Sequence, residues 1–107
     1  MLAKKFRLPI GQSSIMRQKP AWGTYFSYRT LPNELAYSRY GVQVSKKVDK
    51  RAVGRNGIRR TVFDFIRREK FHLRPGFDVL FVSRKPVARG EKKVAEAELR
   101  TFLFYRN

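Results

Sequence analysis

The stretch FDVLFVS, residues 77–83, is an almost continuously apolar run in an otherwise highly charged chain. Arg-Pro-Gly at 74–76 breaks the chain before it, and the basic loop RKPVARG at 84–90 follows it. Short apolar runs bounded by such breakers are typical of strands that are buried on both faces of a sheet. Residues 77–83 therefore predict a buried strand, around which the other elements can be arranged.

The segments on either side predict two further strands and two helices. Residues 21–30 and 40–45 alternate between apolar and polar positions with a period of two, which indicates strands. Helical periodicity runs from a start between residues 50 and 55 to a point near Lys70, and again from Glu91 to Tyr105. The order strand, strand, helix, strand, helix predicts an α/β sandwich. The strands at 40–45 and 77–83 flank one helix, so we expect them to be parallel in one sheet.

Length and composition limit the class of protein. A chain of 107 residues, 42% of them hydrophobic, is large enough for one domain with its own core. We expect that domain over residues 21–107, after a basic, mostly irregular arm at 1–20. The absence of cysteine excludes disulfides and thiolate metal sites and is typical of a reducing compartment. The longest apolar runs are far short of the ~20 residues that span a membrane, and the N-terminal stretch has no signal-peptide core. These features predict a cytoplasmic protein.

The charge is the strongest indication of a partner. Lys and Arg number 25 against 8 Asp and Glu, which gives a formal net charge of +17. Such an excess causes self-repulsion in the folded state and is expected where a polyanion relieves it. Nucleic acid fits best, because no stretch combines a wide apolar face with an opposing lysine face as a membrane-surface helix does. A basic surface without a partner is the alternative.

The segment KRAVGRNGIRR, residues 50–60, concentrates this charge at the start of the first helix without a single acid. On a helical wheel at ~100° per residue, four apolar side chains form the core face: Ile58, Val62, Phe65 and Ile66. The neighbouring sector, which we expect to face outward, holds Asn56, Arg59, Arg60, Phe63 and Arg67, with Arg55 at its border. Guanidinium groups suit phosphates and bases alike, so this sector predicts an RNA-binding surface; a solvated charged face is the alternative.

Gly57 lies inside this helix, where glycine costs ~1 kcal/mol relative to alanine. Close approach by a partner would explain its presence, and so would a local accident of sequence. Both interpretations stay open at this point.

The segment SRYGVQVSKKVDKRAVGRNGIRRTVFDFIR, residues 38–67, resembles the protein subunit of bacterial ribonuclease P. That family has a strand ending in Ser-Lys-Lys and then an arginine-rich helix with an R-N-x-x-[KR]-R core, which is matched here by Arg55, Asn56, Arg59 and Arg60. MLAKKFRL at the start and RPGFDVLFVSRK at 74–85 are also similar to the family. The resemblance covers most of the chain.

Two departures from the family pattern stand out. The family has a short helix after the N-terminal Arg-Leu, whereas PIGQSSIMRQKP at 9–20 contains proline, glycine and serines that argue against a full helix. This puts part of the family's leader-binding cleft in doubt. Phe63 also stands where the family usually has arginine, which removes an RNA contact, and Asp64 stands where it usually has glutamate.

The resemblance implies both a fold and a function. The fold would be the ribosomal protein S5 domain 2-like sandwich, a small mixed sheet with a left-handed βαβ crossover. The function would be 5′ maturation of tRNA as the accessory subunit of an RNA-based endoribonuclease. The catalytic RNA subunit would perform the hydrolysis with Mg²⁺ held mainly by RNA, and the protein would bind that RNA and the 5′ leader of precursor tRNA.

The residues themselves agree that the protein carries no active site of its own. The single histidine, His72, and eight scattered acids form no evident catalytic group, so a protein-only nuclease with metal ions is not predicted. DNA is not an expected partner, because no second helix follows 54–70 within a short turn. A ribosomal or other structural RNA-binding protein of similar α/β fold remains the alternative.

The expected site residues fall into three groups. Basic residues and one amide around the first helix would bind the catalytic RNA: Lys46, Lys47, Lys50, Arg51, Arg55, Asn56, Arg59, Arg60 and Arg67. Lys4, Lys5 and Arg7 would form an arm that becomes ordered on RNA. Tyr25 and Arg29 would contact the leader if Phe26 and Tyr28 are core, since Tyr25 would then be free to stack on a base. The other possibility is that Tyr25 packs under the second helix.

Overall fold

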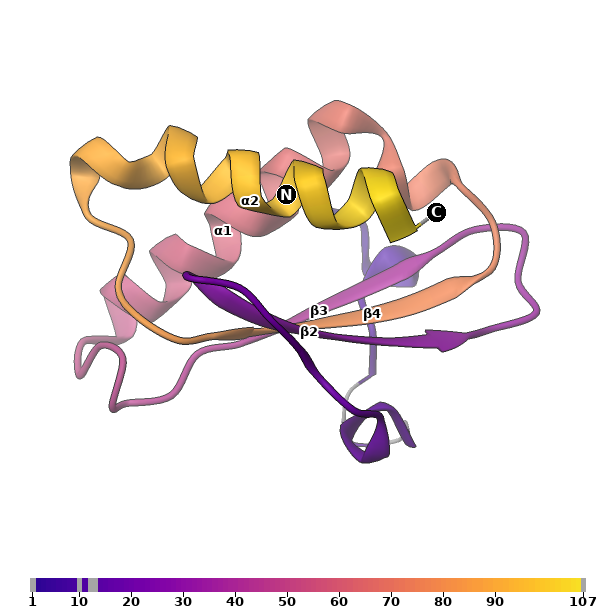
Figure 1. Ribbon diagram of the computed structural model, residues 1–107, viewed down its shortest axis with the longest axis horizontal. Helices are drawn as coiled ribbons and strands as arrows, with labels where there is room; N and C mark the ends of the chain where they lie inside the picture. Colours follow the sequence, from indigo (N-terminus) through magenta and orange to yellow (C-terminus); the bar gives the residue numbers. More distant parts are fainter. Residues whose placement is uncertain (1, 10, 12–13, 107) are drawn as a thin grey trace.

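A computed structural model describes residues 2–9, 11 and 14–106. It contains one four-stranded sheet in the order β1-β2-β4-β3, with two helices across one face (Figure 1). The elements are β1 (Ala21–Trp22), β2 (Phe26–Pro32), β3 (Arg39–Gln43), α1 (Ala52–Glu69), β4 (Phe77–Ser83) and α2 (Lys92–Arg106). Short 3₁₀ turns are η1 (Lys4–Phe6), η3 (Ser14–Arg17), η4 (Phe71–Leu73) and η5 (Arg89–Glu91).

The buried strand is confirmed as β4, which lies between β2 and β3. It pairs antiparallel with β2 and parallel with β3, so the mixed sheet is confirmed too. Val79 and Phe81 join the core under the helices, whereas Leu80 packs on the opposite face with Leu8 and Ile15. Because both faces of β4 are covered, the strand is apolar along nearly its whole length.

The crossover from β3 through α1 to β4 is left-handed, as the resemblance implied. Both strands run from right to left in Figure 1, α1 returns above the sheet, and β4 lies nearer the viewer than β3. Seen from the helices along the strand direction, β4 therefore lies to the left of β3. About 98% of such connections are right-handed, so this feature is diagnostic.

The predicted strand at 21–30 is wrong in one respect, because it consists of two strands joined by a turn. Ala21 and Trp22 form β1, and the chain reverses so that Trp22 pairs with Ser27 of β2. The Gly23 amide donates to the Phe26 carbonyl at 2.8 Å and closes the turn. The alternation in the sequence continues through this turn, so periodicity alone could not reveal it.

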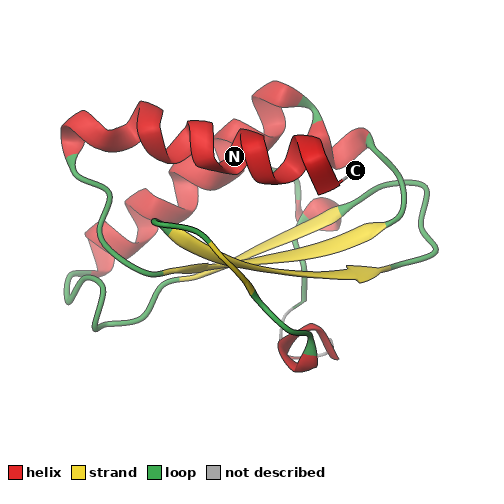
Figure 2. Cartoon of the chain, viewed as in Figure 1, coloured by secondary structure: helices red, strands yellow, loops and turns green. Residues whose placement is uncertain are grey.

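The N-terminal segment, expected to be mostly irregular, is packed on the domain over its described residues. Leu2, Leu8 and Ile15 are buried, and the Leu8 amide donates to the Tyr40 carbonyl at 2.9 Å on the free edge of β3. Between Pro9 and Pro20, the described residues contain the short turn η3 and no α-helix; η3 lies on the sheet face opposite the helices (Figure 2). Residues 10, 12 and 13 of this segment lie outside the described part.

Candidate nucleic-acid interface

Helix α1 begins directly after a basic loop. Arg51, the residue just before the helix, donates its amide to Asp49 Oδ1 at 2.9 Å, and its guanidinium pairs with the same carboxylate at 3.3 Å. This bond from Arg51 lowers the pKa of the Asp49 carboxyl. Gly54 allows the arrangement, because a Cβ there would lie 1.9 Å from Asp49 Oδ2. Asp49 thus acts as an anchor for the start of the helix.

The predicted core face of α1 is confirmed: Ile58, Val62, Phe65 and Ile66 are all buried. The polar residues of the predicted outward sector are at the surface. We call Arg55, Asn56, Arg59, Arg60 and Arg67 the arginine stripe; Asn56, Arg60 and Arg67 are exposed, and Arg55 and Arg59 are half-buried.

Two guanidinium groups of the arginine stripe are held in place by hydrogen bonds. Arg59 Nη1 donates to Asn56 Oδ1 at 3.0 Å, and Arg55 Nη1 donates to the carbonyls of Asp49 and Lys50 at 3.1 and 3.0 Å. Part of the entropy cost of ordering these side chains is therefore met before any partner binds.

The expectation that Phe63 faces outward is wrong. Its side chain is only 6% exposed and belongs to the main core cluster, together with Leu2 and the partly buried Phe6. The N-terminal segment faces this side of α1 and shares its core cluster, which the helical wheel could not show. A residue that stands where the family usually has arginine therefore contributes to packing.

A groove of about 880 Å³ separates the N-terminal segment from α1 along the free edge of β3. Leu8, Tyr40 and Phe63 contribute to its apolar lining. Its basic lining residues are Lys4, Lys5, Arg7, Arg39 and Arg59, and no acid lines it. We call it the edge groove. Lys4, Lys5 and Arg7, the predicted arm residues, are far from the arginine stripe in sequence. The edge groove places them beside it.

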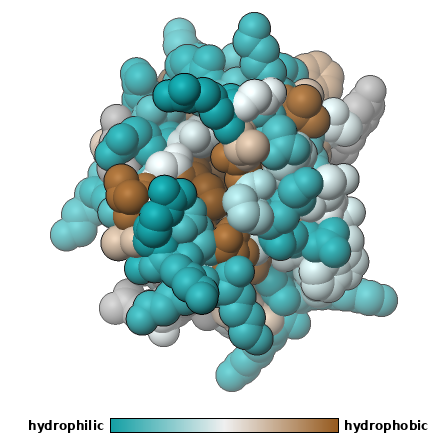
Figure 3. Space-filling model, turned by 90° about the vertical axis from the view of Figure 1, so that its left-hand side faces the viewer, coloured by the Kyte–Doolittle hydropathy of each residue, from teal (hydrophilic) through white to brown (hydrophobic). Residues whose placement is uncertain are grey.

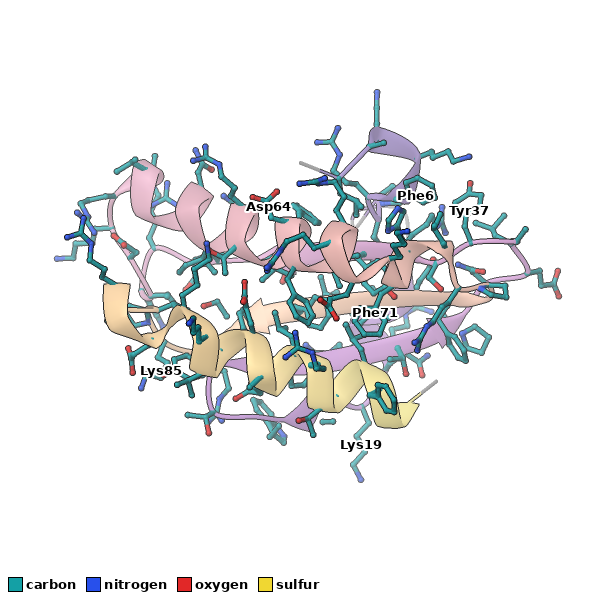
Figure 4. The ribbon with its side chains drawn as sticks, turned by 90° about the horizontal axis from the view of Figure 1, so that it is seen from above. Phe6, Lys19, Tyr37, Asp64, Phe71 and Lys85 are labelled. Carbon is teal, nitrogen blue, oxygen red and sulfur yellow. The ribbon has the colours of Figure 1, made fainter. Side chains whose placement is uncertain are left out.

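Aromatic side chains hold one wall of the edge groove in place. Phe6 and Tyr37, labelled in Figure 4, meet edge to face with ring centroids 5.3 Å apart. The Lys5 ammonium lies over both rings, at 5.0 and 5.1 Å from their centroids. His72 packs against Phe6 at 4.5 Å and is buried after the end of α1. The arm is thus fastened to the domain by aromatic packing.

The other predicted RNA-binding residues gather at one end of the molecule. Lys46, Lys47, Lys50 and Arg51 are all exposed and lie between β3 and the start of α1, at the left of Figure 1. The arginine stripe begins at this end. The residues predicted to bind the catalytic RNA therefore form one continuous surface with the stripe.

The predicted leader contact at Tyr25 is not supported by its position. Tyr25 is 4% exposed, and its hydroxyl donates to Glu91 Oε2 at 2.7 Å. Because Tyr25 lies in the turn before β2, strand alternation does not place it. Phe26 and Tyr28 are core as expected, but Tyr25 joins them under α2. Arg29 lies on the opposite face and donates through Nε to the Gln18 carbonyl at 3.1 Å, so the two predicted leader residues are not brought together.

Sequence reasoning missed three basic residues of the surface. Arg39 lines the edge groove, and Arg89 and Lys92 line a second groove beside the start of α1. Arg39 lies within the family-like segment at 38–67, which could have singled it out. Arg89 and Lys92 had no such signal, because only the tertiary fold places them near α1.

The acids and the histidine of the described residues are dispersed over the fold. Within 2–9, 11 and 14–106, no three His, Asp or Glu side chains gather so that they could hold a metal ion. None of the helices in these ranges is long and apolar enough to cross a membrane. A basic α/β sandwich with a left-handed crossover and an exposed arginine-rich helix defines an RNA-binding protein.

Comparison with known proteins narrows this class. The model of the family described as Ribonuclease P matches residues 12–106. The ribonuclease P protein component of Idiomarina loihiensis is 41% identical over 78 residues, which cover 69% of this chain and 55% of that protein. The one from a Cyanothece strain is 30% identical over 122 residues, covering 96% of this chain and 93% of the relative. The chain belongs to the family of ribonuclease P protein components.

Solved structures of proteins from this family have the same fold as this chain. The RNase P protein from Thermotoga maritima superposes with a TM-score of 0.79 at 28% identity, covering 91% of this chain and 94% of that one. A Staphylococcus aureus RNase P protein shares the fold with a TM-score of 0.79 at 24% identity.

The chain spans about half the length of the first curated relatives that it matches, with 55% for Idiomarina loihiensis and 43% for a Marinomonas species.

Proposed function

We propose that this protein is the accessory subunit of ribonuclease P, which binds the catalytic RNA and supports 5′ maturation of tRNA in the cytoplasm. The observation that carries the proposal is the arginine stripe, which is exposed on α1 within the segment that resembles the family most clearly. Lys46, Lys47 and Lys50 extend the same surface as point charges. No observation favours a ribosomal role.

The division of labour follows from the charges. The protein supplies cations for RNA phosphates, and its acids are largely engaged within the fold. Asp78 pairs with Arg39 at 2.7 Å and Glu96 with Arg68 at 2.6 Å. We therefore place the Mg²⁺ ions of the reaction on the RNA, where they supply charge stabilisation for phosphodiester hydrolysis. The protein would lower the repulsion between the two RNAs.

The 5′ leader of precursor tRNA needs a different location from the one that the sequence suggested. Tyr25 is covered by α2, whereas the edge groove is open, apolar at its floor and lined by five basic residues. Single-stranded nucleic acid is held by cations along such a groove, with bases against apolar and aromatic surfaces. We place the leader there, with Arg59 joining the groove to the arginine stripe. Arg29 does not line the edge groove, so it has no part in this placement.

Reconstitution tests the proposed function. The protein alone should leave precursor tRNA intact, and it should stimulate cleavage by a bacterial ribonuclease P RNA at low Mg²⁺ concentration. The readout is the correct 5′ end of the tRNA on a sequencing gel. A matched reaction with an unrelated protein of similar positive charge controls for charge alone. Equal stimulation by both proteins, or cleavage by the protein without RNA, would contradict the proposal.

A further inference from the structure

A second groove of about 520 Å³ lies on the other side of α1 from the edge groove. Its two walls are the first half of α1 and the loop between β4 and α2. Gly54, Gly57 and Thr61 form the helical wall, and residues 86–89 of the loop form the other. Both helices begin at this end of the molecule (Figure 1), and Figure 3, which looks onto it, shows hydrophobic atoms set between hydrophilic side chains. We call it the loop groove.

Gly57 is the residue that needs an explanation. It lies inside a regular helix, where it costs about 1 kcal/mol relative to alanine. Gly54 is required by the Asp49 carboxylate, but a Cβ at Gly57 would meet nothing within 4 Å. Nothing in the described fold therefore demands glycine at this position. Because Gly57 has no side chain, a partner can come close to the helix backbone at this point.

Basic side chains without an ion-pair partner among the described residues lie on both sides of Gly57. Arg60 lies about 60° around the helix from Gly57, on the side of the arginine stripe. Across the groove stand Arg89 and Lys92, both exposed. Within the described residues, none of these three side chains has an ion-pair partner. The one acid in the lining, Asp49, is already paired with Arg51.

Positive charge on both sides of Gly57 suits the sugar–phosphate backbone of RNA. A backbone strand that lies over Gly57 can approach the helix closely, while its phosphates reach cations on either side. An acidic peptide is less suited, because the helical wall offers no side-chain pocket for specificity. The loop groove also adjoins the surface already assigned to the catalytic RNA.

We propose that the loop groove seats a backbone segment of the catalytic RNA against Gly57 of its helical wall, with Arg89 and Lys92 on the loop side and Arg60 beside Gly57 on α1. This inference rests on the proposed function. It adds a second contact, so that the first half of α1 is held by RNA on the side of the loop as well as along the arginine stripe.

Two matched pairs of variants test the inference in binding of the full-length protein to a ribonuclease P RNA. Gly57→Leu fills the groove, and Ala97→Leu adds similar bulk at an exposed position of α2, away from the groove. We expect Gly57→Leu to lose about tenfold or more in affinity and Ala97→Leu to bind as the unmodified protein does. Because leucine favours the helix over glycine, Gly57→Leu should keep or raise the melting temperature. A variant that is at least as stable but binds RNA more weakly has lost a contact with RNA, not its fold.

Lys92→Ala and Lys93→Ala remove the same charge from neighbouring positions, only the first of which lines the groove. The slope of log K against log salt should become shallower by about 0.7 to 0.9 for Lys92→Ala and stay unchanged for Lys93→Ala. The loop-groove proposal would be overturned if Gly57→Leu bound RNA within about twofold of the unmodified protein, or if the two lysine variants had equal slopes. Either result would leave the proposed function intact. Absence of RNA binding by the unmodified protein would overturn the proposed function and the groove with it.

If Gly57→Leu does not fold, Gly57→Ala replaces it. Alanine has the smaller bulk, and open space surrounds the position. A melting temperature at or above that of the unmodified protein with reduced affinity supports the inference. Unchanged affinity contradicts it.

Discussion

At the scale of single residues, Glu98 decides how the β1–β2 turn is built. One carboxylate from α2 accepts the backbone amides of Thr24, Tyr25 and Phe26 at 2.8, 3.0 and 3.1 Å, and also the hydroxyl of Tyr28. Charge-assisted bonds of this kind are stronger than neutral ones. Glu98 thereby fixes the turn against α2 and places Tyr25 under that helix.

Replacement of Glu98 by glutamine should therefore destabilise the protein. The amide keeps one acceptor oxygen for donors that now use two, and a buried donor left without a partner costs about 1–3 kcal/mol. Glu96→Gln on the same helix is the matched control, because it removes only the surface pair with Arg68, and such pairs contribute about 0.2–1 kcal/mol. Chemical denaturation measures both. Equal losses would show that Glu98 does not organise the turn.

Tyr25 allows the leader assignment to be tested at the same scale. Tyr25→Phe removes the bond to Glu91 but keeps the ring, so binding of leader-bearing precursor tRNA by the holoenzyme should not change. Tyr25→Ala leaves a cavity under α2 and should lower the melting temperature, weakening leader-bearing and leaderless tRNA alike. A loss confined to leader-bearing tRNA would restore Tyr25 as a leader contact.

At the scale of elements, α1 carries most of the proposed function because its sides face different surroundings. One side packs on the sheet, the arginine stripe is at the surface, and the edge and loop grooves lie to either side. Figure 4 shows nitrogen-tipped side chains around this helix. Towards its end, Arg68 pairs with Glu96 and Arg100 of α2 reaches Glu69 at 3.6 Å, which ties α1 to α2. The arginine stripe is therefore carried by a helix that is firmly held to its neighbour.

The double variant Arg59→Ala, Arg60→Ala should remove about two phosphate contacts. With a slope of roughly 0.7 to 0.9 per phosphate, log K against log salt for the catalytic RNA should become shallower by about one and a half units. The control is Lys19→Ala with Lys93→Ala, which removes the same charge from exposed positions outside the arginine stripe and both grooves. The loss should be equal for precursor tRNAs with long and short leaders, because assembly with the RNA is affected. An unchanged slope would remove the arginine stripe from the interface.

At the scale of the whole molecule, the acids are used within the fold while the cations remain for a partner. The formal charge of +17 belongs to a body of only 36 × 26 × 25 Å. Among the described residues, acids that accept internal ion pairs or hydrogen bonds include Asp49, Glu69, Asp78, Glu91, Glu96 and Glu98. The positive surface is therefore little compensated and favours a polyanion at long range.

The whole fold also responds to alkali through its buried tyrosines. The bond to Glu91 raises the pKa of Tyr25, and burial raises the pKa of Tyr28 and of Tyr40. In the unfolded chain these groups ionise near pH 10, so the stability that their neutral forms contribute is complete below pH 10 and falls as the pH rises further. Absorbance of tyrosinate should therefore appear for these three together with loss of the fold. In concentrated guanidinium chloride all tyrosines should titrate near pH 10. Ionisation of all the tyrosines near pH 10 while the protein stays folded would contradict the burial of these three side chains.

Much of this architecture could be predicted, and the failures have a common cause. The strand at 77–83 coincides with β4, and the helices differ from the predicted bounds by one or two residues, because periodicity and breakers are local properties. The outward prediction for Phe63 failed, and the two alternatives for Tyr25 could not be separated, because the environment of each depends on a segment distant in sequence. Phe63 shares its core cluster with Leu2 and Phe6 of the N-terminal segment, and the Tyr25 amide bonds to Glu98 of α2.

The sequence by itself determined that α1 would be a helix, that Ile58, Val62, Phe65 and Ile66 would face the core, and that a cationic surface would adjoin them. These follow from the order of residues along one element, whose geometry is regular. Only the tertiary structure decided where that surface continues. The edge groove joins α1 to Lys4, Lys5 and Arg7, and the loop groove joins it to Arg89 and Lys92. Grooves arise between elements, so their lining depends on how distant segments pack, which no local pattern encodes.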